Sequence, residues 1–323
     1  MTRARAGAGL RVAVLGDPAG WHVGRVIAAL ANRGHEAKAV RWCAMAAVVG
    51  GTLPGVGPTG GDVREGFLPS AIDAADVIVV RGMPVGSLEE VVFRMDLLAR
   101  LAARGTIVAN SPRGLEIAID KYLSLARLAA AGLPVPHTVV AQDPATIEAA
   151  WQGFGRDCVA KPLFGSCGRG LVRVADTTAV ADLCRRYAPA GYSGGPPAAG
   201  GVAYLQEFVP HHGWDVRVLL VGDEAFAIRR VAADGEWRTN LSVGGRGVPF
   251  TPPAEWLDLA RRAAAVAEAG IAGVDLLPAR DGRVLVLEVN AVPGWRGLES
   301  ATGVDVAARV AGYLERLAAN ADR

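Results

Sequence analysis

Short apolar runs alternate with helix-spaced apolar positions along the first third of the chain. Residues 10–15 (LRVAVL) form one apolar run, and residues 23–33 carry apolar side chains at helical spacing before Gly34, a residue type that commonly ends helices. Further apolar runs at 76–80 (DVIVV) and 106–109 (TIVA) flank a helical pattern at 88–103. Buried strands that alternate with helices are typical of parallel sheets, so we expect a small α/β domain over residues 1–110.

The pattern changes after residue 110. Ser111 and Pro112 are a capping residue and a first-turn proline, and they predict the start of one helix that ends at residues 131–132. Apolar runs at 158–162 and 171–174 bracket a glycine-rich stretch, and residues 188–201 (APAGYSGGPPAAGG) predict a long connection. We expect a small central lobe over residues 111–200.

The rest of the chain, residues 201–323, predicts mainly antiparallel strands. Apolar runs occur at 203–208, 216–221, 225–231, 273–277 and 284–289, and helical patterns occur at 255–269 and 304–318. Short turns at 222–223 and 281–282 are typical of antiparallel pairs. We therefore expect a C-terminal lobe built on an antiparallel sheet, which completes an α/β fold of three parts.

Charge and composition narrow the classes of function. The 323 residues are 51% hydrophobic and 20% charged, and the formal net charge is +2 without any run of five like charges. This balance gives no electrostatic signal for nucleic acid or for a membrane surface. The four cysteines lack the spacing of a zinc site, and no apolar run reaches the roughly 18 residues of a membrane span. We expect a cytoplasmic enzyme that acts on small molecules.

A lysine followed by a glycine-rich stretch is the first candidate phosphate site. The stretch KPLFGSCGRG begins at Lys161 and contains Gly165, Ser166, Gly168 and Gly170. Glycines let backbone N–H groups approach an anion closely, and the lysine supplies a point charge. The lysine precedes the loop, unlike the P-loop pattern, and the dinucleotide-binding fingerprint is missing. A glycine hairpin with a solvated lysine is an equally good interpretation of this stretch alone.

Three oxygen-bearing side chains form a candidate metal site. Glu288 and Asn290 are two residues apart in VLVLEVNAV and therefore project from one face of a strand, and Asp275 lies on the preceding apolar strand. Carboxylates in such strands are costly unless they are paired or bound to a metal. Magnesium prefers oxygen ligands and is often completed by substrate phosphates. An internal salt bridge or a solvated sheet face is the alternative.

Weaker signals lie between these two groups. An extended segment could present its backbone to adenine, and it comprises Gln206, Glu207, Phe208 and Val209. Asp215 follows, where an acid could bind ribose hydroxyls. Taken alone, this segment is more often a plain hairpin edge.

Positive and amide side chains around the same strands could hold a phosphoryl group during transfer. The candidates are Arg217, Arg229 and Asn240, with Arg230 beside them. An arginine pair of this kind is more often a solvated strand end.

Taken in order, these motifs resemble the ATP-grasp superfamily and its RimK-type glutamate ligase branch. The matching segments span nearly the whole chain and are NSPRGLEIAIDK (110–121), KPLFGSCGRG, QEFV, DVRV, TNLSVGG, GVDLL and EVNAVPG. The resemblance implies two lobes that clamp ATP, with Lys121 and Lys161 on its phosphates and the loop at 165–170 closing over them. It also implies that the 206–209 segment contacts adenine and Asp215 the ribose. Asp275, Glu288 and Asn290 would hold two Mg²⁺ (or Mn²⁺) ions.

The activity that this resemblance implies is amide-bond formation through an acyl phosphate, with L-glutamate added to a carboxylate acceptor. Residues 81–96 and the PGWRGL segment at 293–298 look more like ligases that add glutamate to tetrahydromethanopterin-type pterins. Another amino acid in place of glutamate, and a peptide or protein as the acceptor, are alternatives within this activity. Three other functions are also alternatives: a small-molecule kinase, a regulatory ATP-binding protein and, as the weakest of the three, a dinucleotide-dependent dehydrogenase. We also expect a homo-oligomer that contacts neither nucleic acid nor membrane.

Overall fold

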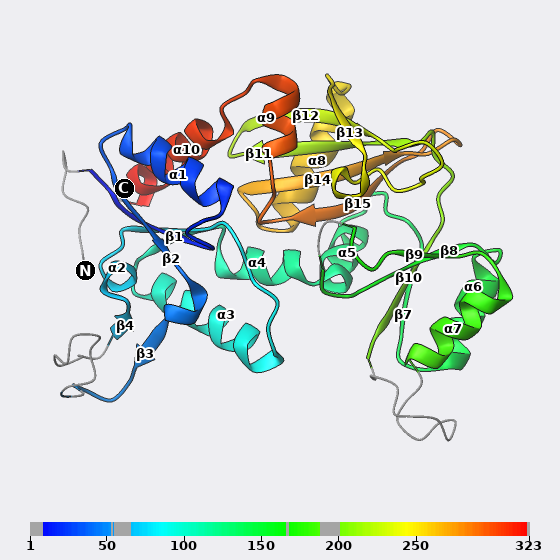
Figure 1. Cartoon of the computed structure of the whole chain (residues 1–323), viewed down its shortest axis with the longest axis horizontal. Helices are drawn as coiled ribbons and strands as arrows, with labels where there is room; N and C mark the ends of the chain where they lie inside the picture. Colours follow the sequence, from blue (N-terminus) through cyan, green and yellow to red (C-terminus); the bar gives the residue numbers. More distant parts are fainter. Residues whose placement is uncertain (1–8, 53, 55–65, 166–167, 188–200, 322–323) are drawn as a thin grey trace.

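The computed structural model describes residues 9–52, 54, 66–165, 168–187 and 201–321, which form three adjoining parts (Figure 1). An N-terminal α/β domain lies at the left of Figure 1, a C-terminal sheet with its helices at the top, and a small central lobe at the right. Within the described ranges, no helix combines the length and the apolar content needed to cross a membrane. The α/β fold of three parts expected from the sequence is confirmed.

The N-terminal domain is built on a parallel four-stranded sheet in the order β2-β1-β5-β6. Its strands are β1 (Arg11–Leu15), β2 (Glu36–Val40), β5 (Val77–Val80) and β6 (Ile107–Ala109). Helices α1 (Trp21–Ala31) and α3 (Leu88–Ala103) pack on it, together with the small elements η1 (Trp42–Ala44), β3 (Ala46–Val48), β4 (Gly66–Leu68) and α2 (Ser70–Asp73). Gly34 follows α1 in the left-handed conformation, at φ 81°, as the sequence predicts.

The single helix expected after residue 111 is wrong, because the chain breaks into α4 (Pro112–Ile119) and α5 (Lys121–Ala130). Asp120 leaves the helical conformation at φ −96° and ψ 104°, and its carboxylate accepts hydrogen bonds from the N–H groups of Tyr122 and Leu123. An aspartate can cap a helix in this way and so compete with continuation of the previous helix. The break places Lys121 at the first position of α5.

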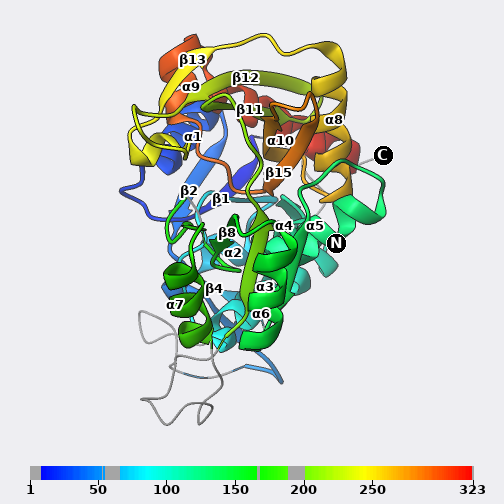
Figure 2. The same ribbon diagram turned by 90° about the vertical axis from the view of Figure 1, so that its right-hand side faces the viewer.

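The central lobe is an antiparallel sheet in the order β7-β10-β8-β9, with two helices side by side on one face (Figure 2). Its elements are β7 (Thr138–Ala141), α6 (Pro144–Gly153), β8 (Cys158–Lys161), β9 (Val172–Val174), α7 (Thr177–Tyr187) and β10 (Ala203–Glu207). Strand β10 lies between β7 and β8. The expected boundary after residue 200 therefore falls inside this lobe, because a strand pattern does not reveal which sheet the strand joins.

The C-terminal lobe carries a five-stranded antiparallel sheet in the order β13-β12-β11-β14-β15. Its elements are β11 (Trp214–Val221), β12 (Glu224–Val231), η2 (Leu241–Val243), β13 (Arg246–Pro249), α8 (Ala254–Val266), β14 (Ile271–Pro278), β15 (Val284–Asn290), α9 (Arg296–Thr302) and α10 (Val306–Ala321). One face packs on α8 through apolar side chains such as Val216 and Val274. Because side chains alternate along a strand, Asp215 and Arg217 lie on the opposite face.

The last helix returns to the N-terminal domain, where α10 packs against α1 (Figure 1). Asn110 adds a polar link: its amide nitrogen donates to the carbonyls of Ile271 and Ala291, both at 2.7 Å, and its oxygen accepts from the Ile271 N–H at 2.8 Å. These hydrogen bonds of Asn110 fix the ends of β14 and β15 relative to the N-terminal sheet.

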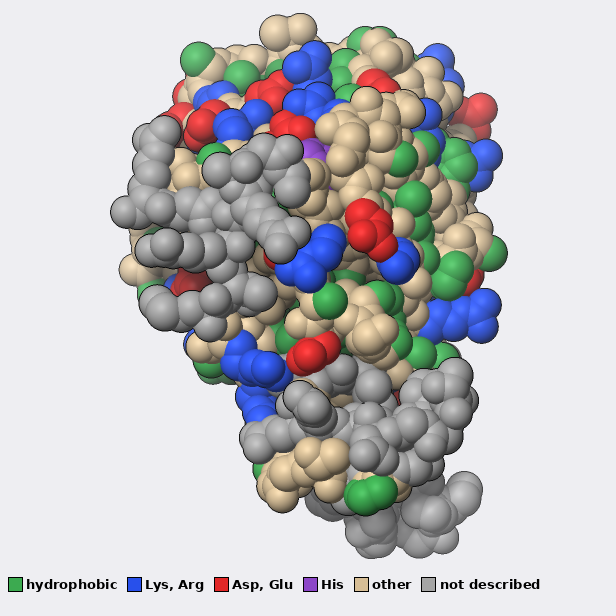
Figure 3. Space-filling model, turned by 90° about the vertical axis from the view of Figure 1, so that its left-hand side faces the viewer, with side chains coloured by type: hydrophobic (Ala, Val, Ile, Leu, Met, Phe, Trp, Pro, Cys, Tyr) green, Lys and Arg blue, Asp and Glu red, His purple; other side chains and the backbone are tan. Residues whose placement is uncertain are grey.

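On the face shown in Figure 3, basic and acidic side chains lie beside one another.

Candidate active site

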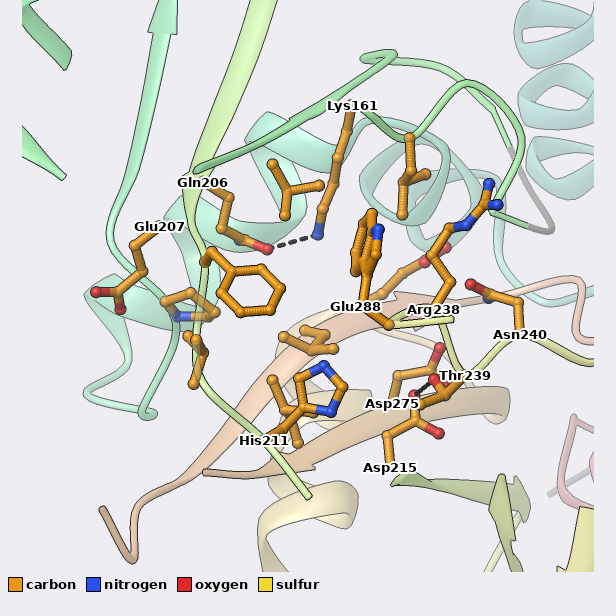
Figure 4. A pocket seen from close by; sticks show the side chains of 18 of the residues that line it. Lys161, Gln206, Glu207, His211, Asp215, Arg238, Thr239, Asn240, Asp275 and Glu288 are labelled. Atoms are coloured by element: carbon orange, nitrogen blue, oxygen red, sulfur yellow. Dashed lines mark hydrogen bonds between the residues drawn. The ribbon is translucent and has the colours of Figure 1, made fainter. Parts of the chain in front are cut away.

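A pocket lies between the central sheet and the C-terminal sheet (Figure 4). Lys161 and Gln206 reach it from β8 and β10, while Asp275 and Glu288 reach it from β14 and β15. Tyr204 and Lys161 are paired in one sheet, and Asp275 and Glu288 are paired in the other. The two sheets therefore bring a cationic side and an acidic side of the pocket to face each other.

Lys161 is a desolvated cation whose hydrogen-bond partner is a neutral amide. Its Nζ donates to Gln206 Oε1 at 2.5 Å, and Gln206, only 2% exposed, donates onward to Thr138 Oγ1 at 3.0 Å. Burial lowers the pKa of Lys161 to about 8, although the Glu288 carboxylate acts in the opposite direction. A buried ammonium without a bound carboxylate is well suited to pair with an anionic ligand.

Lys121 holds the start of the glycine-rich loop. Its Nζ donates to the carbonyl of Gly165 at 2.8 Å and, at 3.4 Å, to that of Leu163. Burial lowers the pKa of this lysine as well. Ser166, expected to contact phosphate, lies outside the described residues. The second predicted phosphate lysine thus lies against the loop that was expected to close over the nucleotide.

The end of the same loop packs tightly against Asn240. Gly168 and Gly170 adopt left-handed backbone conformations, at φ 68° and 74°. A Cβ on Gly168 would lie 2.6 Å from Asn240 Oδ1, which is shorter than any van der Waals contact. Glycine is therefore required here both by its backbone angle and by the close approach of a pocket side chain.

Arg230 is the centre of a buried ion-pair network beneath the pocket. It is 5% exposed, donates to the two carboxylate oxygens of Asp215 at 2.7 and 2.5 Å, and lies 2.8 Å from Asp275. Thr239 donates to Asp215 at 2.7 Å, and Arg217 binds Asp275 through two nitrogens. Burial opposes ionisation of Asp275, but Arg217 and Arg230 hold its pKa below the usual range. Both oxygens of Asp215 are engaged here, so the structure does not leave them free for a ribose.

The predicted metal residues lie together on one face of two neighbouring strands. Asp275 is opposite Glu288 in the register of β14 and β15, and Asn290 is opposite Gly273. The Glu288 carboxylate makes no hydrogen bond or ion pair within the described part of the chain, whereas Asn290 Oδ1 accepts from the Val292 N–H at 2.8 Å. The described residues contain no cluster of three His, Cys, Asp or Glu side chains that could hold a metal. Oxygen donors of this kind suit a hard divalent cation that takes its remaining ligands from phosphates. Glu288 offers free carboxylate oxygens for such an ion, whereas both oxygens of Asp275 are engaged by Arg217 and Arg230.

The opposite end of the pocket is apolar and aromatic. Phe208 lies 5.9 Å from Trp237 and 5.9 Å from His211 between ring centroids, and Val209 lines the pocket beside them. The side chain of Glu207 points away from the pocket (Figure 4), where it accepts a hydrogen bond from the N–H of His137 at 3.0 Å. A flat apolar cleft of this kind suits a planar heterocycle. The sequence did not reveal Trp237 or His211, which come from irregular segments without a periodic pattern.

Arg229 is not brought to the pocket. Its guanidinium stacks on Trp214 at 4.3 Å and on Phe250 at 4.7 Å. Neighbouring residues of a strand point to opposite faces, so Arg230 takes the position inside the network. Asp215 is opposite Arg230 in the register of β11 and β12. This strand pairing is the signal that identifies Arg230, and not Arg229, as the arginine on the pocket face.

Comparisons with known proteins give the family and the fold of the chain. Residues 118–314 match the RimK-like ATP-grasp domain. The tetrahydromethanopterin:alpha-L-glutamate ligase of Methanosarcina acetivorans is 34% identical over 262 residues, which cover 75% of this chain and 80% of that enzyme. The ATP-grasp ligase PsnB in complex with a minimal precursor superimposes with a TM-score of 0.71 at 25% identity, covering 95% of this chain and 98% of PsnB. Another structure of PsnB, bound to a phosphomimetic variant of that precursor, Mg and ADP, gives 0.70 at 23% identity, with 98% and 100% coverage. The chain belongs to the RimK-like ATP-grasp family, and it is an ATP-grasp ligase that forms amide bonds.

Proposed function

We propose that this ligase adds L-glutamate to a carboxylate acceptor that it first activates with ATP. The observation that carries the proposal is the arrangement of the pocket, in which Lys161 faces Glu288 across a cleft with an aromatic end. The aromatic end receives the base and the lysine side receives the phosphates. Glutamate is the amino acid named for the relative from Methanosarcina acetivorans.

The residues of the pocket divide the chemistry among them. Lys161 and Lys121 neutralise the ATP phosphates, and Arg217 with Asn240 stabilises the γ-phosphoryl group while a carboxylate oxygen of the acceptor attacks its phosphorus. The bond to the bridging oxygen breaks and ADP leaves, so that an acyl phosphate forms. The glutamate amine then attacks the acyl carbon, phosphate leaves, and the amine proton is lost to solvent or phosphate.

Two further roles follow from burial and charge. Asp275, Glu288 and Asn290 would hold Mg²⁺ or Mn²⁺, proposed as two ions, which would supply Lewis-acid stabilisation of the phosphoryl oxygens. Asp215 positions Arg230, whose charge is added to the same end of the pocket. The glycine-rich loop excludes water from the acyl phosphate, which would otherwise hydrolyse.

A pterin cofactor with a carboxylate side chain is the acceptor that the relative from Methanosarcina acetivorans suggests. A peptide acceptor is the second candidate, because PsnB, whose fold this chain shares over 95% of its length, was solved with a precursor. The homo-oligomeric state expected from the sequence remains a prediction.

An ADP-release screen tests the proposal. Purified enzyme with MgATP would be offered each amino acid against a panel of carboxylates, including pterin carboxylates and acidic peptides, and products would be weighed by mass spectrometry. We expect ADP release that requires both L-glutamate and one acceptor class, with a mass gain of one glutamyl residue. Release with lysine or alanine but not glutamate would refute the glutamate assignment. Product formation without any amine would indicate a kinase, and ATP binding without ADP release would indicate a regulatory protein.

A further inference from the structure

A second group of polar side chains lies beyond the carboxyl ends of β1 and β5 in the N-terminal sheet. In the order β2-β1-β5-β6, strand β2 lies on one side of β1 and strand β5 lies on the other, so the direction in which strands are added reverses between β1 and β5. In open parallel sheets, the crevice at such a reversal is where ligands bind. Gly16 follows β1 there, and Arg81 follows β5, with its N–H donating to the carbonyl of Leu15 at 2.7 Å.

Arg81 is a buried cation with unused hydrogen-bonding capacity. It is 7% exposed, and its Nη2 donates to the carbonyl of Pro293 at 2.5 Å. Its Nε and Nη1 are buried and have no partner among the described residues, and no carboxylate there pairs with it. The guanidinium stacks on Trp295, 4.0 Å from the ring centroid, and burial lowers its pKa to about 9. Two unpaired donors on a buried charge indicate that an acceptor group belongs beside them.

The neighbours of Arg81 are also donors. Trp295 is 1% exposed, and its indole Nε1 likewise has no partner among described atoms. Helix α1 starts at Trp21 without a side-chain cap or an acidic residue in its first turn, so its end carries partial positive charge. His22 accepts the Trp295 N–H at its Nε2, at 3.0 Å. Burial, and then Arg81 and Arg296, lower the His22 pKa to about 4, so His22 is neutral near pH 7 and adds no second positive charge beside Arg81.

This crevice lies close to the acidic side of the pocket. Pro293, whose carbonyl binds Arg81, lies three residues after Asn290. A Cβ on Gly273 would lie 3.0 Å from Pro293 and 3.2 Å from Nη1 of Arg217, so both side chains flank this glycine. Arg217 in turn binds Asp275, which lines the pocket.

We propose that Arg81, Trp295 and the first turn of α1 form a subsite for a carboxylate of one of the two ligase substrates. The unpartnered atoms of Arg81 and Trp295 are all donors, which suits an oxyanion, and each free N–H of the guanidinium can make a charge-assisted hydrogen bond to a carboxylate oxygen. The proposal rests on the proposed function, because L-glutamate and the acceptor both carry carboxylates. The subsite holds the substrate by a carboxylate that is not activated, next to the residues that transfer phosphate.

The first experiment measures binding without ATP. Glutarate, and its neutral analogue glutaramide, would be titrated by calorimetry into the wild-type enzyme, Arg81→Gln and Trp295→Phe. Arg94→Gln is the matched control, because Arg94 is also buried, at 8% exposed, but is bonded to Glu90 and to the Pro84 carbonyl. We expect glutarate to bind the wild type and Arg94→Gln alike, glutaramide to bind neither, and Arg81→Gln to bind glutarate about tenfold or more weakly, as loss of a charge-assisted hydrogen bond predicts. Trp295→Phe, which keeps the aromatic ring and removes one donor, should weaken binding several-fold.

The second experiment assigns the substrate. A higher KM for L-glutamate alone in Arg81→Gln would identify the amine substrate, and a higher KM for the acceptor alone would identify the acceptor, with the KM for ATP unchanged in both cases. The proposal is overturned if the wild type does not bind glutarate, or if Arg81→Gln only lowers thermal stability, because a buried water would then be the partner of Arg81. If Arg81→Gln does not fold, unchanged glutarate binding by Trp295→Phe overturns the proposal. Glutarate binding requires no turnover, so it tests the subsite separately from the proposed function. An enzyme that is inactive with every substrate pair would refute the proposed function, while the glutarate titrations would still confirm or refute the subsite.

Discussion

Raising the pH should weaken ATP binding through Lys161, at a lower pH than an ordinary lysine would allow. Burial brings the pKa of Lys161 from 10.5 to about 8, so the charge is lost as pH rises through about 8. If only the charged form binds the phosphates, the fraction competent to bind falls from roughly 90% at about pH 7 to roughly 10% at about pH 9. The dissociation constant for ATP should therefore rise about tenfold across this interval.

Calorimetry with a non-hydrolysable ATP analogue and Mg²⁺ at several pH values measures this dependence. Lys161→Arg keeps a positive charge at every pH tested, so its affinity should be lower but nearly independent of pH. Lys38→Arg is the matched control, because Lys38 is exposed on β2 and pairs with Glu36 at 2.7 Å. Lys121 also titrates, but its contribution to the pH dependence of ATP binding is the same in the wild type, Lys161→Arg and Lys38→Arg. Equal pH slopes for wild type and Lys161→Arg would refute the assignment of a desolvated phosphate lysine.

Four further substitutions test the acidic side of the pocket and the glycine-rich loop. Glu288→Gln should lower kcat by about a hundredfold or more without loss of stability, because it removes a proposed metal ligand that makes no hydrogen bond or ion pair with the described residues; steady-state kinetics and urea unfolding measure the two effects. Asp275→Asn should lower kcat similarly and also reduce the free energy of unfolding by about 3 kcal/mol, because the half-buried Arg217 loses its carboxylate partner and the buried Arg230 keeps only Asp215; equal stability of the two variants would contradict the ion-pair network. Gly168→Ala should reduce kcat more than Gly170→Ala. Both glycines have positive φ, but only a Cβ on Gly168 would lie 2.6 Å from Asn240. Equal values of kcat for the two variants would show that this contact does not constrain the loop.

Features carried by a few adjacent residues could be predicted from the sequence. Glu288 and Asn290 share a face because side chains alternate along a strand, and the register with β14 places Asp275 beside them. Lys161 is followed directly by its glycine-rich loop. The chain has only three lysines, and Lys121 and Lys161 are the two placed at this site, a signal in the composition that local patterns do not show.

Long-range partners could not be predicted in the same way. The sequence shows Asp215 as an acid at the start of a strand, but its engagement by Arg230 and Thr239 depends on strand pairing and on a distant loop. The break at Asp120 depends on a choice between helix continuation and side-chain capping that is nearly balanced in energy. The unused donors of Arg81 become visible only when the N-terminal crevice meets the segment after β15.

Transfer of an isotope label tests the acyl phosphate most directly. The carboxylate acceptor identified by the ADP-release screen would be labelled with ¹⁸O in its carboxylate and converted with unlabelled ATP and L-glutamate, and the released phosphate would be analysed by mass spectrometry. Attack of a carboxylate oxygen on the γ-phosphorus, followed by loss of phosphate to the amine, predicts one ¹⁸O atom in each phosphate released and ADP free of label. Unlabelled phosphate, or label recovered in AMP, would contradict the account.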